Sequence, residues 1–479
     1  MTDTHQQSMK AAAEDHALVS VPAEHRYSGY KLALSPISVA TALVIFSIAG
    51  FTIMLAGFKA GLTGSIMVAI LGFILGKLLG NMAFQTGMSS TITSRFFGFG
   101  LKGSSIGAAI FTFMILGFLA LESALLYEGT LLMFNWVDNW PNRILLYGLM
   151  TIAWILLAIF GLKLALRASG LLTVVTLLVS MYMIIQLYVV GNANPMAVFT
   201  TPGLVPGSFV NKLEVAIAIM GATAGTISLV TADFARYCRT KKDVTILAIA
   251  GPLTQNFIMT ILGALIVIGG LPEIIQYLMH RDAGLSPEEA AVAAGGFVMG
   301  NTGAFFVVLA SWIGFITIYA AQGKAQAINA YSGSLSLVNL CDALLGKKPG
   351  RAFMVIVGNI IALVMIAANI LGEFTAWLSF LGCMTLGLCG VMISDYYIVR
   401  KGIFDSRTHQ IENWNWAGVM TLIVCASIGI ILIGTKVFSL GFLVTFILSL
   451  MIYPILRKLL PEGTATDFVS NLKALDAAE

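Results

Sequence analysis

The chain has 479 residues, of which 58% are hydrophobic and 10% are charged, and its net charge is +4. Soluble domains carry about 25% charged residues, so this composition excludes a water-soluble globular protein. The apolar residues fall in blocks of about 20, the length that crosses a hydrocarbon core of about 30 Å, and predict an all-α polytopic membrane protein. Basic loops explain the small positive charge, and we expect no nucleic-acid partner.

Twelve transmembrane helices are predicted in chain order. Residues 1–35 form a polar tail without the apolar core of a signal peptide. Ten spans make a core over residues 36–399, two additional spans follow in 400–458, and residues 459–479 form a second tail. The predicted spans are 36–58, 62–85, 104–134, 143–163, 168–190, 208–237, 243–270, 303–328, 352–371, 373–399, 415–434 and 437–458.

An even number of spans puts both tails on one side of the membrane, and basic residues indicate which side. Twenty Lys and Arg residues fall on the side of the tails and five on the other. Because loops rich in Lys and Arg stay in the cytoplasm, we expect both termini to be cytoplasmic, in a multi-pass protein of the bacterial inner membrane surrounded by its lipids.

Two spans contain stretches that form weak helices. The first has Ser47 to Thr52 near its centre, and the sixth has the run of small residues from Gly221 to Thr226. Glycine in a helix interior costs about 1 kcal/mol relative to alanine, and an open backbone in lipid is tolerated only where it is buried in protein or lines a cavity. Two broken spans, five apart, predict a five-plus-five inverted repeat with a ligand site at mid-membrane. The alternative is that the small residues only allow close helix packing.

Three motifs resemble the nucleobase:cation symporter-1 family, the purine–cytosine permeases and their allantoin and hydantoin transporter relatives. They are Lys102-Gly-Ser before the third span, Thr231-Ala-Asp-Phe-Ala-Arg-Tyr-Cys-Arg after the sixth, and Ile393-Ser-Asp-Tyr-Tyr-Ile-Val-Arg-Lys-Gly after the tenth. The resemblance implies a LeuT-type fold with broken first and sixth helices. It also implies alternating access to small heterocycles, driven by sodium or protons.

The resemblance also implies a substrate site on the third and eighth spans. The family's stacking tryptophan falls at Phe118, a polar residue one turn later falls at Glu122, and the edge-binding amides fall at Gln326 and Asn329. Residues four apart share one helix face, so Phe118 and Glu122 can meet one ligand. Without the resemblance, Phe118 would be read as a core or lipid contact, whereas a carboxyl group at mid-membrane by default marks a site or a proton relay.

The two predicted breaks would complete the pocket with backbone and small side chains. Relatives often present a second aromatic wall there, but no tryptophan stands at either break, and Phe51 is the candidate replacement. The residues predicted to line the pocket from the breaks are Gly50, Phe51, Gly221, Thr223, Ala224 and Thr226.

Sodium coupling is not expected. Sodium-dependent relatives place a hydroxyl pair on the eighth span, where this chain reads from Ala320 to Ala325 without serine or threonine. Lys324 in this stretch is a candidate for the vacated cation position. The alternative, given equal weight, is that its long side chain extends to the cytoplasmic surface. The cysteines show no metal-ligand spacing, and we expect neither a metal nor a cofactor.

These features predict a secondary active transporter that imports a nucleobase-like heterocycle, a purine, cytosine or a related ring. Coupling to protons is expected, with Glu122 as the carrier, in a monomeric protein. The alternative is a carrier of an amine, an amino acid or a vitamin-like heterocycle on the same fold. An enzyme is not expected, because the sequence lacks HExxH, GxSxG and histidine-rich clusters.

Overall fold

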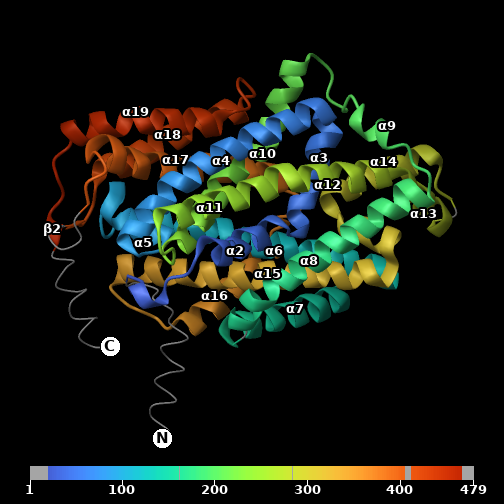
Figure 1. The fold of residues 1–479 in the computed structure, drawn as a ribbon, viewed down its shortest axis with the longest axis horizontal. Helices are drawn as coiled ribbons and strands as arrows, with labels where there is room; N and C mark the ends of the chain where they lie inside the picture. The colour runs from blue at the N-terminus through green and yellow to red at the C-terminus, as the bar shows by residue number, and fades with distance from the viewer. Residues whose placement is uncertain (1–19, 161, 283, 405–410, 467–479) are drawn as a thin grey trace, which may run out of the picture.

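The computed structural model describes residues 20–160, 162–282, 284–404 and 411–466. The chain is almost entirely helical, and most long helices run along one direction of the molecule (Figure 1). Up to the sixth predicted span, the elements are η1 (Ala23–His25), α2 (Gly29–Ala40), α3 (Leu43–Ala56), α4 (Phe58–Thr86), α5 (Ser90–Ser94), η2 (Arg95–Phe99), α6 (Ser104–Phe134), α7 (Trp140–Phe160), α8 (Leu162–Ile185), η3 (Gln186–Val190), α9 (Pro195–Phe199) and α10 (Phe209–Ala235).

The second half begins with a span of 41 residues made of five consecutive helical pieces. These pieces are α11 (Lys241–Leu253), η4 (Thr254–Ile258), α12 (Met259–Gly263), η5 (Ala264–Ile268) and α13 (Gly269–Arg281). The remaining elements are α14 (Pro287–Gly300), α15 (Gly303–Leu345), α16 (Arg351–Ala367), α17 (Phe374–Ile393), η6 (Ser394–Val399), β1 (Ile411–Glu412), α18 (Trp416–Gly434), α19 (Gly441–Leu459) and β2 (Ala465–Thr466).

Ten helices of the described residues are long and apolar enough to cross a membrane, and the bent pair α2 and α3 brings the number to eleven. The helix at the predicted ninth span, α16, has 17 residues and is a shorter apolar helix. The polytopic all-α class is therefore confirmed, while the count of twelve stays a prediction. The domain bounds also stay predictions, although α2 begins at Gly29 inside the predicted tail, and residues 1–19 and 467–479 lie outside the described part.

The first span is broken, but not where the sequence analysis placed the break. Helices α2 and α3 meet at an angle of 62°, and Thr41 caps the last turn of α2 by donating its hydroxyl to the carbonyl of Ile37 at 2.9 Å. Gly50 and Phe51 lie inside the continuous helix α3. A Cβ at Gly50 would come within 2.7 Å of Val267 in η5, so this glycine serves close helix packing.

The predicted break in the sixth span is wrong, because α10 runs as one helix from Phe209 to Ala235. Hydroxyl groups bond back within the helix, from Thr223 to the carbonyl of Met220 at 2.6 Å and from Thr226 to that of Ala222 at 3.1 Å. A Cβ at Gly221 would meet the ring of Phe442 in α19 at 1.9 Å. Packing with neighbouring helices outweighs the low helix propensity of the small residues, which is the alternative that the sequence analysis had left open.

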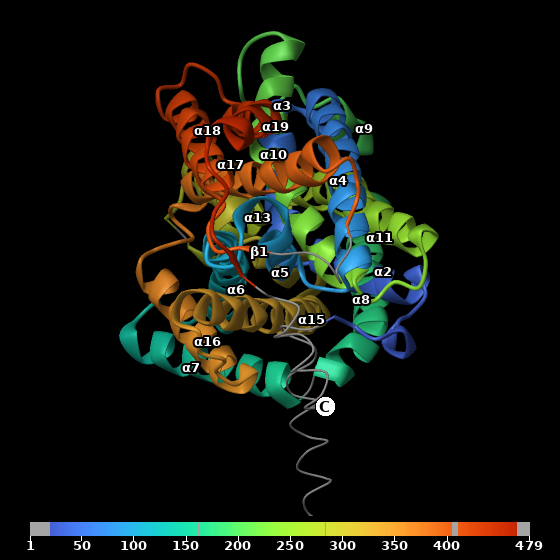
Figure 2. The same ribbon diagram turned by 90° about the vertical axis from the view of Figure 1, so that its left-hand side faces the viewer.

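Two long helix pairs form the centre of the molecule, α4 with α10 and α6 with α15. Helices α18 and α19 lie on one flank and α7 and α16 on the opposite flank (Figures 1 and 2). The segment of α5 and η2 makes polar contacts with both central pairs. Ser90 donates its backbone N–H and its hydroxyl to Asp233 of α10 at 2.8 and 2.7 Å. Just after α5, Arg95 pairs with Asp342 of α15 at 2.6 Å.

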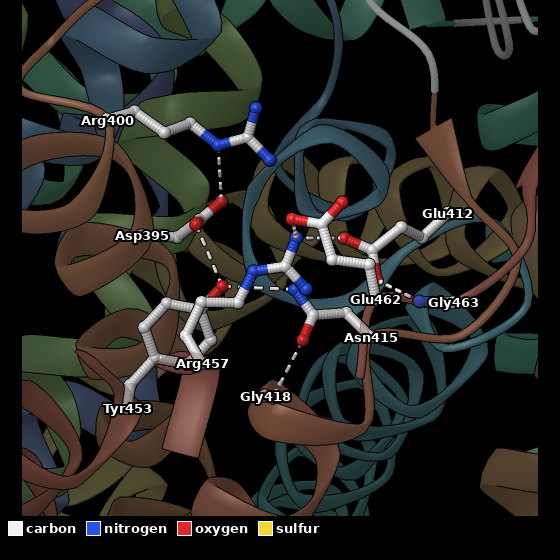
Figure 3. A network of polar contacts seen from close by, with 9 residues as sticks. All are labelled: Asp395, Arg400, Glu412, Asn415, Gly418, Tyr453, Arg457, Glu462 and Gly463. Carbon is white, nitrogen blue, oxygen red and sulfur yellow. Dashed lines mark hydrogen bonds and ion pairs between the residues drawn. The ribbon is translucent and has the colours of Figure 1, made fainter. Parts of the chain in front are cut away.

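The last two helices are joined to the end of the tenth predicted span by a buried polar network (Figure 3). Asp395 of η6 accepts the hydroxyl of Tyr453 at 2.8 Å and the Nε of Arg400 at 2.9 Å. The hydroxyl of Tyr453 in turn accepts from the amide of Asn415 at 3.0 Å. The third motif of the family resemblance thus joins η6, at the end of α17, to α19.

We expect the Tyr453→Phe variant to be less stable than the wild type. Losing the hydroxyl removes one of the hydrogen bonds to the Asp395 carboxylate and takes away the acceptor of the buried Asn415 amide, which costs roughly 1–3 kcal/mol. The melting temperature in detergent should fall, with exposed Tyr30→Phe as the matched control, since Tyr30 is 77% exposed. An unchanged melting temperature for Tyr453→Phe would show that the network does not stabilise the fold.

The connection between α6 and α7 carries an exposed ion pair that resists titration. Asp138 accepts hydrogen bonds from Arg143, at 2.6 Å from Nε, and from Tyr127 at 2.7 Å. These bonds lower the pKa of Asp138 to about 2. Because the folded-state pKa is lowered, the ion pair contributes its full stability at pH values above the ordinary value of 3.8. This contribution is lost only as the pH falls through about 2. We therefore expect Asp138→Asn to leave the pH profile of uptake in vesicles unchanged; a shifted profile would place a coupling group here.

Candidate functional site

Three of the predicted site residues meet between α6 and α15. Glu122 and Asn329 are 1% exposed, and Gln326 is fully buried. Asn329 donates its amide to Glu122 and also to the side-chain oxygen of Gln326, both at 3.3 Å. Gln326 donates to the backbone carbonyl of Leu119 and to the hydroxyl of Ser123, both at 2.9 Å. The long pairing of α6 with α15 brings these groups into one buried polar network.

Phe118 lies one turn before Glu122 on α6 and is 6% exposed. Its ring stands edge-on to Trp377 of α17, with centroids 5.0 Å apart and an angle of 85° between the rings. The structure therefore places Phe118 in an aromatic cluster next to the polar network. Sequence reasoning did not single out Trp377, because its position depends on how α17 packs against α6.

Lys324 lies at the break in the first span. Its Nζ donates to the hydroxyl of Thr41, between α2 and α3, at 2.5 Å, and to the hydroxyl of Thr173 in α8 at 3.0 Å. The side chain is 1% exposed, so it is buried and does not extend to the surface. The side-chain nitrogen of Lys324 thus lies at the meeting point of three spans, where it contacts two hydroxyl oxygens.

A second residue of α15 holds the same break and was missed by the sequence analysis. Gln322 accepts the backbone N–H of Leu43, the first residue of α3, at 3.3 Å. The first N–H groups of a helix have no partner within the helix, so the side-chain oxygen of Gln322 satisfies one of them. Gln322 lies four and seven residues before Gln326 and Asn329, a spacing that places all three on one helix face and that was readable in the sequence.

Glu122 and Lys324 interact electrostatically but form no direct ion pair within the part of the chain that the structure describes. Their backbones lie on different helices, and each side chain has polar partners of its own. Across the described residues, no group of three or more His, Cys, Asp or Glu side chains could hold a metal ion.

The residues predicted from the two breaks do not join this network. Gly50 packs against η5 and Gly221 against α19. Thr223 donates to the side-chain oxygen of Asn256 in η4 at 3.1 Å. Ala224 and Thr226 lie in the buried interior of the continuous helix α10, and Phe51 packs against the apolar core. The main chain of these residues is not opened, because both stretches remain helical.

Comparison with known protein families gives a match over most of the chain. A family model described as "Permease for cytosine/purines, uracil, thiamine, allantoin" matches residues 20–453. The chain belongs to this permease family. The resemblance inferred from the three motifs is thereby confirmed, and the permease is a transporter and not an enzyme. No curated protein sequence matches the permease.

Solved structures share the fold of the permease over almost its whole length. One is Mhp1, a nucleobase-cation-symport-1 family transporter in a closed conformation with bromovinylhydantoin bound, at 17% identity and a TM-score of 0.69, covering 93% of this chain and 96% of that chain. The inward-facing conformation of Mhp1 has 17% identity and a TM-score of 0.68, covering 92% of each chain. The substrate-bound outward-open state of a Na⁺-coupled sialic acid symporter has 12% sequence identity and a TM-score of 0.64, covering 97% of this chain and 98% of that chain. The LeuT-type fold is thus confirmed.

Proposed function

We propose that the permease imports an uncharged, nucleobase-like heterocycle together with protons, and that the buried network between α6 and α15 binds the substrate. The hydrogen bond of Asn329 to Glu122, beside the ring of Phe118, is the observation that carries this proposal. Amide side chains offer both a donor and an acceptor, as the edge of a nucleobase does. The two contacts of Asn329 are long, at 3.3 Å, so a ligand can replace them at small cost.

Phe118 would stack on the flat face of the ring, and Glu122, Gln326 and Asn329 would bond its edge. The main chain around Gly50 and Gly221 has no part in this site, since both glycines face other helices. Gln322 takes their place as the link from the substrate face of α15 to the break in the first span.

Proton coupling is proposed because two titratable groups share the membrane interior with the substrate site. Glu122 would carry the proton, and Lys324 would supply a resident positive charge at the break, where sodium would otherwise need oxygen ligands. The two hydroxyls that could offer such oxygens, those of Thr41 and Thr173, are engaged by the ammonium group. We further propose that both termini face the cytoplasm in the inner membrane and that the monomer transports.

A panel of radiolabelled compounds in proteoliposomes tests the proposal. It should contain cytosine, uracil, hypoxanthine, allantoin, hydantoin and thiamine, each with and without an imposed proton gradient. We expect saturable, gradient-driven uptake of at least one flat, uncharged heterocycle, and exchange of the preloaded compound. Uptake that does not saturate and shows no exchange would argue for a channel.

A carrier of amines or amino acids is the second candidate, because a buried carboxyl group such as Glu122 can bind an ammonium group. The ammonium of Lys324 disfavours it, since a second cation in the same interior would meet electrostatic repulsion. A thermal-shift screen of nucleobases against primary amines separates the two candidates. Stabilisation by amines alone would favour the second one.

A further inference from the structure

The residues that follow α19 pair with the segment that precedes α18. Strand β2 runs antiparallel to β1. Next to the strands, Asn413 donates its backbone N–H to the carbonyl of Thr464 at 2.9 Å and its side-chain amide to the hydroxyl of the same residue at 3.2 Å. We call residues 411–415 and 461–466 together the strap. The strap lies at the end of the molecule that carries α5 (Figure 2).

The carboxylate of Glu412 fixes the two halves of the strap to each other and to α19 (Figure 3). It accepts the backbone N–H of Gly463 at 2.9 Å and forms an ion pair with Arg457, near the end of α19. The two side chains of this ion pair are only 13% and 14% exposed, so it is largely shielded from water. A shielded, hydrogen-bonded ion pair contributes more to stability than an exposed one. Specific contacts therefore hold the strap in place.

The strap also contacts the turn between η2 and α6. Leu101 donates its backbone N–H to the carbonyl of Glu412 at 2.7 Å. Lys102 donates its backbone N–H to the carbonyl of Asn413 at 2.8 Å. At Gly100, where φ is +80°, a Cβ would lie 2.5 Å from the carbonyl oxygen of Glu412. Lys102 begins the first motif of the family resemblance, so this motif lies at the contact with the strap.

This turn continues a segment that joins the two central helix pairs. Ser90 of α5 bonds to Asp233 of α10, and Arg95 of η2 pairs with Asp342 near the end of α15. Arg95 is 3% exposed, so the ion pair lies within the protein. In carriers with alternating access, one helix bundle rocks against another around a fixed site. Rocking of α4 and α10 against α6 and α15 would have to break contacts of this segment when this end opens.

We propose that the strap regulates the opening of the permease at this end, by holding α5 and η2 in place between the central pairs. The inference rests on the proposed function, because a carrier has to open and close here in each cycle. The strap precedes α18 and is joined to α19 through Arg457. The two helices that follow the tenth predicted span therefore act on gating and not on substrate binding.

The test measures how fast a membrane-impermeant maleimide labels Thr91→Cys in α5, with the full-length permease in lipid nanodiscs. Thr91 is 4% exposed, so its cysteine should react only when α5 leaves its place. Glu412→Ala removes the acceptor of Gly463 and the partner of Arg457. It should raise the labelling rate about fivefold, the effect of one lost hydrogen bond on a local opening equilibrium. Glu462→Ala is the matched control and should leave the rate unchanged, because the Glu462 side chain is 79% exposed.

A second reporter separates a gating role from a general loss of stability. Ser47→Cys lies in α3 beside Thr302, which precedes the first residue of α15, and Ser47 is 1% exposed. Its labelling should stay slow in Glu412→Ala, because this variant loosens only the other end of α15. The rate of the same chain without a reporter is subtracted, since the native Cys341 is half-buried.

A second strap variant covers the case in which Glu412→Ala does not fold. Gly100→Ala places a Cβ against the carbonyl of Glu412 and should speed the labelling of Thr91→Cys in the same way. Gly148→Ala is its control, because nothing lies within 4 Å of the added Cβ. An unchanged rate at Thr91→Cys in both strap variants, or faster labelling of both reporters, would overturn the proposal. Labelling needs no substrate, so a negative uptake panel would count against the proposed function alone.

Discussion

The Glu122→Gln variant is expected to lose concentrative uptake while it keeps part of its substrate binding and exchange. Glutamine has nearly the same shape and its oxygen can still accept the amide of Asn329, a bond of 3.3 Å in the wild type. It cannot take up or release a proton. An ionisable group in the membrane interior is the default candidate for a proton relay, so its loss should uncouple substrate movement from the proton gradient.

Uptake of external labelled substrate measures both activities, with empty proteoliposomes for accumulation and with proteoliposomes preloaded with unlabelled substrate for counterflow. Accumulation against a gradient should fall until the inside and outside concentrations are equal, while counterflow continues. Glu128→Gln is the matched control, because Glu128 lies on the same helix, less deeply buried than Glu122, and outside the network. Undiminished accumulation by Glu122→Gln would exclude a proton-carrying role for this residue.

The Lys324→Met variant is expected to lose transport almost completely. Methionine keeps most of the length of the side chain but leaves the hydroxyls of Thr41 and Thr173 without their donor. It also removes the positive charge that interacts with Glu122. Leaving a buried polar group without its hydrogen-bond partner costs roughly 1–3 kcal/mol per group, and here two hydroxyls at the meeting point of three spans lose theirs.

Initial uptake rates and melting temperatures should be measured together for this variant, so that lost transport can be separated from lost folding. Lys77→Met is the control. Lys77 also donates to a threonine hydroxyl, that of Thr245 at 2.5 Å, but it lies on α4 away from the network. Transport at the wild-type rate in Lys324→Met would show that the resident cation has no part in the cycle.

The composition and the hydrophobic blocks predicted the membrane-spanning class, and the three motifs predicted the family. The family resemblance also implied that Glu122, Gln326 and Asn329 share one site, and their side chains do meet between α6 and α15. Gln322 was within reach by the same spacing. Trp377 was not, because its place beside Phe118 depends on a contact between α6 and α17 that no local pattern encodes.

The error at Gly221 to Thr226 has a physical cause. Local propensity makes this stretch a weak helix, but an opened backbone in hydrocarbon costs several kcal/mol per unsatisfied group. The helix is kept because Phe442 fills the space at Gly221 and the hydroxyls of Thr223 and Thr226 bond to carbonyls within it. At the first span, the break lies at Thr41. There Gln322 of α15 accepts the free backbone N–H of Leu43, and Lys324 of α15 donates to the hydroxyl of Thr41. The carrier function therefore rests on family membership and on one break held by α15, and not on two opened spans.

The central claim, that a resident lysine stands where sodium would bind and that protons drive the cycle, is tested most directly by uptake under imposed ion gradients. Proteoliposomes at fixed pH, with and without an inward sodium gradient, should take up the substrate at the same rate, whereas an inward proton gradient without sodium should drive its accumulation. A steep dependence of uptake on sodium at fixed pH, with no response to the proton gradient, would contradict the claim.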